Sequence, residues 1–342
     1  MKFRAVLVVA ALATALMPLD PVKVERWYST ALYPRVQGLI TPVTNRVPFA
    51  LLDIAVALCL IGLAILVVRR LKTLSVRRAL LRTVWSLVSS AAVLYLLFLV
   101  LWGLNYRRLP LERKLDWERT RVTERAAVDL ANTAAASVNA RFDSAHASEW
   151  DGPSLERSFG EVQHLLGASR GAVPGTPKRS LLSFYFRWAA VDGMTDPFFL
   201  EIIVNPDLLQ IERPFVIAHE WAHLAGYADE SEANFVAWLT CLRGDALAQY
   251  SGWLAAYEHA VRALPRDARR GLTPLGPGPR SDFQAMAARY ARSSPAVRAA
   301  AHDVYDSYLK ANRVQEGIAS YDAVVRLMLG TRFGPGWTPL AR

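Results

Sequence analysis

The stretch His219-Glu220-Trp221-Ala222-His223, followed closely by Asp229-Glu230-Ser231-Glu232-Ala233-Asn234, decides which fold we expect for this chain. The first five residues have the pattern HExxH. On a helix, residues four positions apart share one face, so both imidazoles can reach one ion. Zinc accepts two such nitrogens together with a carboxylate and a water, and Glu220 is placed to act on that water as the catalytic general base. The pattern predicts a Zn2+ site on a helix.

The acidic cluster after this helix supplies the third ligand. Asp229 and Glu232 have the spacing of a capping box, in which Asp229 caps the next helix and Glu232 reaches back to the cap. Glu230 is then free to turn toward the metal, and Asn234, one turn further on, can orient a ligating histidine from behind. Asp229 is the alternative ligand, because HExxHxxGxxD also fits a metzincin pattern. The cap role of Asp229 and the lack of a distinct Met-turn favour Glu230.

Chance occurrences of HExxH often lie on surface helices with charged residues at the two x positions. Here these residues are Trp221 and Ala222, which suits a helix buried in the centre of a domain. A buried helix whose histidines merely form hydrogen bonds is the alternative to a metal site.

Two strands are predicted before the HExxH helix. Residues 198–205, between two prolines, have the clearest strand pattern in the chain, and residues 181–191 are a second candidate. In zinc peptidases, the strand just before the HExxH helix commonly borders the cleft, where a peptide adds as one more strand. An internal strand without a ligand is the alternative. The residues of the predicted substrate edge are Phe199, Leu200, Glu201 and Ile202.

Three apolar runs precede the large polar part of the chain, at residues 5–19, 48–68 and 83–104. The second and third are long enough to cross a hydrocarbon core of about 30 Å. The first is short, and is either a cleaved signal peptide or an uncleaved first helix, which we favour. The sequence therefore predicts two or three transmembrane helices.

The net charge of +10 lies almost entirely in this region, because residues 1–104 carry +9 and residues 105–342 only +1. This distribution indicates membrane topology and argues against nucleic-acid binding. The link between the second and third runs is rich in arginine and lacks acids, so it is expected in the cytoplasm. The part after Asn105 then lies outside the cytoplasmic membrane of a multi-pass protein.

Glu230-Ser231-Glu232-Ala233-Asn234 resembles the E-x-x-A/S-D/N element of gluzincin-type zinc metallopeptidases, whose first glutamate is the third zinc ligand. The separation from His223 is shorter than gluzincins usually have. The chain is also similar to an uncharacterised family of bacterial membrane proteins with N-terminal spans and an external HExxH domain. The residues that carry this similarity are Gly193, Pro197-Phe198, Glu201, Val204-Asn205, His219-Glu220, Ala222-His223, Gly226, Glu230, Glu232-Ala233-Asn234-Phe235, Tyr305, Tyr308-Leu309-Lys310 and Ser320-Tyr321. The resemblance implies a zinc peptidase-like activity.

Enzymes of this type also use a tyrosine or histidine to stabilise the oxyanion of the reaction. The candidates are Tyr305, Tyr308, Tyr321 and His302, each of which has a packing role as the alternative.

The expected architecture is mainly α with a small β-sheet, an α+β, zincin-like domain at 105–342 preceded by a membrane region at 1–104. The expected function is that of a zinc metallopeptidase of the bacterial envelope, with the lipid bilayer and a peptide or protein substrate as partners. A non-proteolytic envelope hydrolase and a catalytically silent membrane scaffold are the alternatives.

Overall fold

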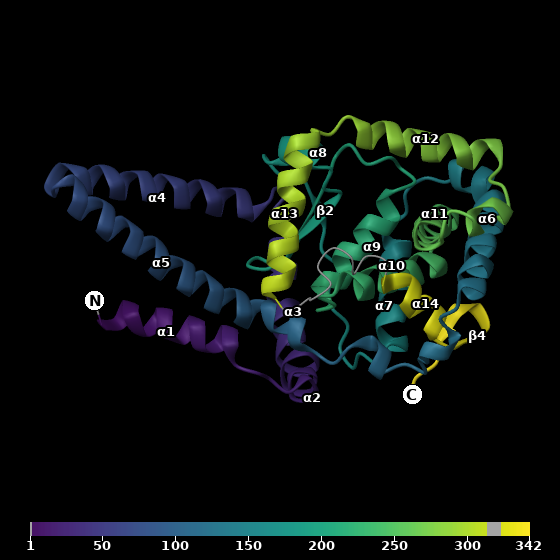
Figure 1. The fold of residues 1–342 in the computed structure, drawn as a ribbon, viewed down its shortest axis with the longest axis horizontal. Helices are drawn as coiled ribbons and strands as arrows, with labels where there is room; N and C mark the ends of the chain where they lie inside the picture. Colours follow the sequence, from purple (N-terminus) through teal and green to yellow (C-terminus); the bar gives the residue numbers. More distant parts are fainter. Residues whose placement is uncertain (1, 313–322) are drawn as a thin grey trace.

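The computed structural model describes residues 2–312 and 323–342 and is mainly helical. Three helices, α1 (Lys2–Leu16), α4 (Leu51–Thr73) and α5 (Val76–Leu101), project from one side of a helical domain (Figure 1). They include most of each apolar run that the sequence singles out, although α5 begins seven residues earlier than the run at 83–104.

The helices α4 and α5 are each long and apolar enough to cross a membrane. They form an antiparallel pair joined by a short turn, and Arg70 near that turn donates to Thr83 Oγ1 (3.2 Å) and Ser86 Oγ (2.8 Å). Within the described residues, α4 buries none of its side chains, as expected of a helix that faces lipid. The helix α1 packs along α5 and counts toward a third span only if it and the bent segment after it are one unit.

The segment between α1 and α4 is helical and packs into the domain. It comprises α2 (Pro21–Val24), the π-helix η1 (Glu25–Leu32) and α3 (Tyr33–Thr44). The buried Tyr33 hydroxyl donates to Leu224 O (2.9 Å), and Thr41 Oγ1 donates to Leu200 O (2.8 Å). Residues on both sides of the sequence-based boundary at 104/105 therefore build one packed body.

At the centre of the domain, α9 (Arg213–Leu224) packs on α10 (Glu230–Arg243), which is buried along nearly its whole length. The surrounding helices are α6 (Glu124–His146), α7 (Gly152–Leu165), α8 (Ser183–Ala189), α11 (Ala246–Ala263), α12 (Pro277–Ala291), α13 (Pro295–Ala311) and α14 (Ala323–Gly330). Short 3-10 turns (Gly103–Arg107, Leu111–Arg113, Arg119–Arg121, Ala268–Gly271 and Pro335–Trp337) and a C-terminal pair, β4 (Phe333–Gly334) and β5 (Thr338–Pro339), complete it.

A small sheet lies beside α9, in the order β1 (Pro177–Lys178), β3 (Glu201–Val204) and β2 (Gly193–Asp196). The strand β3 is central: it pairs in parallel with β1 and antiparallel with β2, and all four of its residues are buried. The predicted substrate edge at Phe199, Leu200, Glu201 and Ile202 is therefore wrong. Phe199 and Leu200 precede the strand. The near-continuous apolar run at residues 198–204 is typical of a strand that is buried inside a sheet and covered on both faces.

A further local prediction also fails. Most of residues 181–191, predicted as a strand, form the helix α8, and β2 begins after it, at Gly193. Among the described strands, β2 is thus the edge strand that lies nearest α9.

Candidate metal centre

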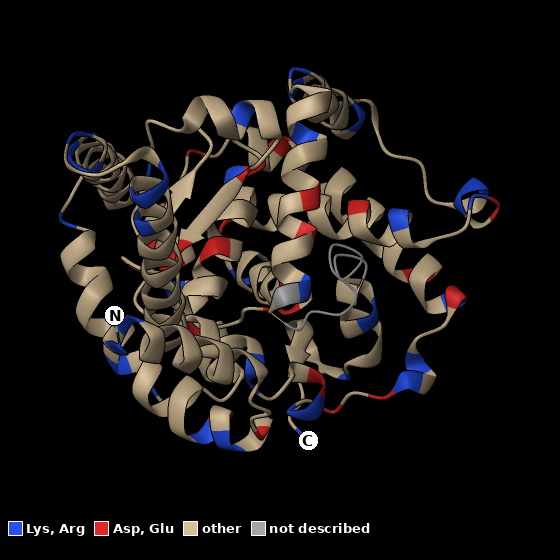
Figure 2. Ribbon diagram, turned by 60° about the vertical axis from the view of Figure 1, so that its left-hand side comes forward, with Lys and Arg blue, Asp and Glu red and all other residues tan. Residues whose placement is uncertain are grey.

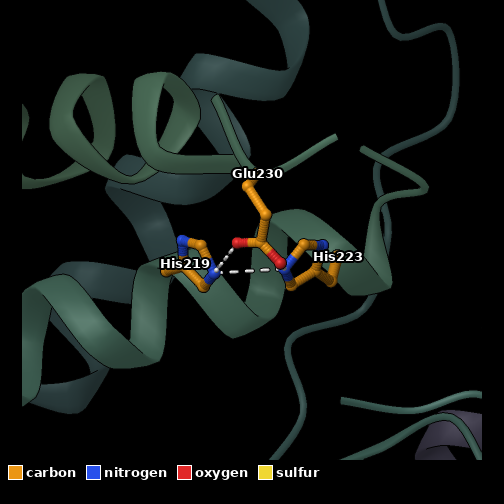
Figure 3. Close-up of side chains that lie close together, drawn as sticks. All are labelled: His219, His223 and Glu230. Carbon is orange, nitrogen blue, oxygen red and sulfur yellow. Dashed lines mark hydrogen bonds and ion pairs between the residues drawn. The ribbon is translucent and has the colours of Figure 1, made fainter. Parts of the chain in front are cut away.

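Both histidines of the HExxH pattern lie on α9, whose ends follow from the local sequence. Pro214 occupies the first turn, where a missing N–H is tolerated, and Gly226 leaves the helix with φ of +82°. His219 and His223, four residues apart, project from the same face toward α10 (Figure 3).

The helix α10 begins with the predicted cap. Asp229 Oδ1 accepts hydrogen bonds from Ser231 N (2.9 Å) and Glu232 N (3.3 Å). Glu230, the first residue of the helix, turns toward the two imidazoles, whereas Asp229 is occupied by the cap. Glu232 does not reach back to the cap as expected; instead it accepts from Leu111 N at 2.6 Å. Burial, together with the nearby Asp229, raises the pKa of Glu232 to about 7.

The three predicted ligands converge. His219 Nε2 and His223 Nε2 lie 3.1 Å apart, and the Glu230 carboxylate oxygens lie 3.2 Å from His219 Nε2 and 3.7 Å from His223 Nε2 (Figure 3). One ligand atom from each residue fits within a group in which no two atoms are more than 4.8 Å apart. Such a group could hold a metal ion.

The Nδ1 atoms of both rings form hydrogen bonds, and these bonds determine whether the Nε2 atoms carry a proton or a lone pair. His223 Nδ1 lies 2.8 Å from the carbonyl oxygen of Tyr227, and His219 Nδ1 lies 2.9 Å from Asn234 Oδ1, as predicted for Asn234. Because both partners are acceptors, each Nδ1 carries the proton, and each neutral ring then presents a lone pair at Nε2. Two lone pairs at 3.1 Å repel each other unless a proton or a cation lies between them.

The charges point the same way. Burial alone would lower the pKa of His223, but the Glu230 carboxylate outweighs it and raises that pKa to about 9. Burial would raise the pKa of Glu230, but the two histidines hold it well below its usual value. Among the described residues, none donates a hydrogen bond to the buried Glu230 Oε2, which instead lies 3.2 Å from His219 Nε2. The cluster therefore favours a positive charge, which either a proton on His223 or a bound cation can supply.

Glu220 is buried and its carboxylate rests against β2. Thr195 Oγ1 lies 2.8 Å from Glu220 Oε2 and 3.0 Å from the Glu220 carbonyl oxygen. A Cβ at Gly193 would lie 2.5 Å from Glu220 Oε1, so only glycine allows this approach. Burial raises the pKa of Glu220, partly offset by the two histidines, and a raised pKa suits a general base. The sequence gives no signal for Thr195.

The helix α13 brings two of the candidate tyrosines to the site. The Tyr305 hydroxyl donates to Glu230 Oε1, and Tyr308 accepts a hydrogen bond from Tyr106 at 3.4 Å. Burial raises the pKa of Tyr308 to about 12, so it stays protonated and can donate. His302 is more than half exposed and pairs with Asp303, away from the cluster. Tyr321 lies outside the described residues.

The end of α5 contacts α9 directly. Trp102 Nε1 donates to the carbonyl oxygen of His223 at 2.9 Å, and the Phe98 and Tyr308 rings lie 6.3 Å apart. These contacts join residues more than 100 positions apart, and no local pattern in the sequence predicts them. The group that could hold a metal therefore lies within a few side chains of α5, a helix that could span a membrane.

Together, the fold and the site define a membrane-associated helical protein with a buried His–His–Glu group on two central helices. The chain belongs to the family described as "Protein of unknown function (DUF3810)", which matches residues 28–329. The matched region contains both apolar helices and all three residues of the group. No curated protein and no solved structure matches the chain.

Proposed function

We propose that the protein is a membrane-anchored zinc metallopeptidase of the gluzincin type, with zinc held by His219, His223 and Glu230. The observation that carries this proposal is the pair of Nε2 atoms 3.1 Å apart, both with engaged Nδ1 atoms, beside the buried Glu230 Oε2, to which no described residue donates a hydrogen bond. Two imidazoles and one carboxylate are the ligand set of a catalytic zinc site that leaves one position open.

When bound, zinc supplies Lewis acidity, which makes water more acidic and polarises a peptide carbonyl. Glu220 takes the proton of the attacking water and passes it to the leaving amine. Thr195 holds the Glu220 carboxylate in one orientation through its hydroxyl. Tyr308 can donate its hydroxyl proton to a developing oxyanion, since its bond with Tyr106 uses it as the acceptor.

The proposed substrate is a peptide bond of an envelope protein or peptide close to the membrane surface. The contact between Trp102 and the His223 carbonyl supports this position, because it joins the site to the end of α5. The arginine-rich turn between α4 and α5 lies at the ends of the helices remote from the domain (Figures 1 and 2). Positive residues favour the cytoplasm, so we propose that the domain is extracytoplasmic.

Comparison of the envelope proteome of wild type with that of Glu220→Gln tests the enzyme proposal. Glutamine keeps the shape of Glu220 but cannot accept a proton, so the substrate should accumulate uncut while the protein keeps its metal and its abundance. Glu258→Gln, an exposed change on α11, is the matched control and should behave as wild type. Identical peptide profiles for wild type and a metal-loaded Glu220→Gln protein would refute catalysis and favour a scaffold.

A further inference from the structure

The helix α8 is apolar on its outer face. Leu181, just before it, and Phe184, Tyr185 and Trp188 are 83%, 50%, 40% and 49% exposed. Phe184, Tyr185 and Trp188 lie on one side of the helix by their spacing, and Leu181 lies in the turn that leads into it. Phe186 on the opposite side is buried. The helix is thus attached to the domain by one apolar face and presents a second to its surroundings.

This outer face lies where α4 leaves the domain. Asp53, in the first turn of α4, accepts hydrogen bonds from Ser180 Oγ (2.5 Å) and from Leu181 N (2.7 Å). Figure 1 shows α8 on the side of the domain from which α4 and α5 project. If α4 crosses the bilayer, its first turn lies at the membrane surface, and α8 lies beside it at the same level.

We propose that α8 is an interfacial helix whose outer face, Phe184, Tyr185 and Trp188, inserts among the lipids next to α4 together with Leu181 of the preceding turn. Tryptophan and tyrosine are favoured at the boundary between headgroups and acyl chains, where an apolar ring and a polar edge are both satisfied. Because this apolar face lies beside α4 at the level where α4 would enter the bilayer, lipid is the occupant that we propose.

This lipid contact would fix the positions of two elements beside the candidate site, β2 and α13. Only three residues separate α8 from β2, the strand against which Glu220 rests. The carbonyl oxygen of Trp188 accepts a hydrogen bond from Ser294 N (2.9 Å), which begins the turn into α13, the helix that carries Tyr305. The lipid contact itself does not depend on the proposed peptidase activity.

The test uses the full-length protein in phosphatidylcholine–phosphatidylglycerol nanodiscs. Cys59 is changed to serine and the buried Cys241 is kept, so that a single new cysteine can carry an NBD fluorophore. Leu181→Cys and Tyr185→Cys probe the outer face without touching the Phe184–Trp188 ring contact. Ala140→Cys, exposed on α6 at the far side of the domain, is the matched control (Figure 1).

Lipids brominated on the acyl chain should quench the probes at 181 and 185 at least about twofold, because an interfacial helix sits roughly 5–10 Å into the headgroup and acyl boundary. The probe at 140 should be unaffected. Equal quenching at all three positions would overturn the proposal. Probes at 181 and 185 that are shielded from aqueous iodide but not quenched by brominated lipid would also overturn it, since a protein would then cover this face.

Discussion

Replacing Glu230 by glutamine should remove most of the affinity for zinc. Glutamine preserves the volume of the side chain but removes the charge that holds the pKa of His223 up, and it weakens the third ligand. The matched control is Asp229→Asn, because the neighbouring acid caps α10 and asparagine caps a helix equally well.

The size of the effect follows from the coordination. Loss of a group that merely orients a ligand costs 10–100-fold in metal affinity, so loss of a charged ligand should cost at least about 100-fold, or about 2.7 kcal/mol. Zinc at about 1,000 times its Kd stabilises the fold by about 4.1 kcal/mol. In the Glu230→Gln protein the same zinc concentration should stabilise the fold by only about 1.4 kcal/mol.

Zinc content by elemental analysis and the Tm with and without chelator measure this effect in detergent. Comparing the Tm of each variant with that of its own zinc-free form excludes any effect of the substitution on the stability of the zinc-free fold. Wild type and Asp229→Asn should bind about one zinc and lose the same Tm increment on chelation, as a three-residue site predicts. A full increment in Glu230→Gln, with a loss in Asp229→Asn, would assign the ligand to Asp229. Wild type purified without chelator and free of metal would refute the site.

Three other predictions concern the surroundings of the site, each measured by chemical unfolding in detergent. Gly193→Ala should destabilise the protein by about 1–3 kcal/mol, because the new Cβ displaces the Glu220 side chain. Gly160→Ala on α7, where a Cβ meets no other atom, is the control and should stabilise the protein by about 0.5–1 kcal/mol; equal effects would contradict the close approach of Gly193 to Glu220. Lys178→Met should lower the free energy of unfolding by about 3–5 kcal/mol, because it leaves the buried Glu201 carboxylate without the ammonium group 2.6 Å away. The double variant Lys178→Met/Glu201→Gln should regain most of this stability, and a double variant no more stable than Lys178→Met would argue against the ion pair. Burial lowers the pKa of His259 to about 4 from 6.5, so the unfolded chain binds a proton near pH 5 that the folded protein does not, and the free energy of unfolding should fall by about 2 kcal/mol between pH 7 and pH 5. His259→Gln should lose that part of the pH dependence; an unchanged pH profile would show that the pKa of His259 is the same in the folded and unfolded states.

The candidate membrane spans and the two helices of the His–His–Glu group could be predicted because their signals are local. A run of more than twenty apolar residues fills a bilayer, and histidines four apart share a helix face, whatever the rest of the chain does. The cap at Asp229 is local too, and it correctly left Glu230 free to face the two imidazoles. The distance of Asn234 from the cluster followed from the same helical spacing.

The prediction that this strand forms the substrate edge failed because strand pairing is not local. Residues 198–205 show that a strand is present, but only the packed chain decides that β3 is central and β2 is the edge. The helix α8 was missed for a related reason. Aromatic residues favour strands in isolation, and here the packing of Phe186 into the domain and the hydrogen bonds to Asp53 select a helix.

By itself, the sequence determined where the chain can cross a membrane and which two imidazoles can share an ion, because both depend on spacing along one helix. Only the tertiary structure decided that Glu230 closes the group, that Thr195 and Gly193 determine the position of Glu220, and that Trp102 joins the site to a helix that could span a membrane. Each of these contacts joins residues from different elements. Their positions depend on how the helices and the sheet pack, which no repeat or spacing in the sequence records.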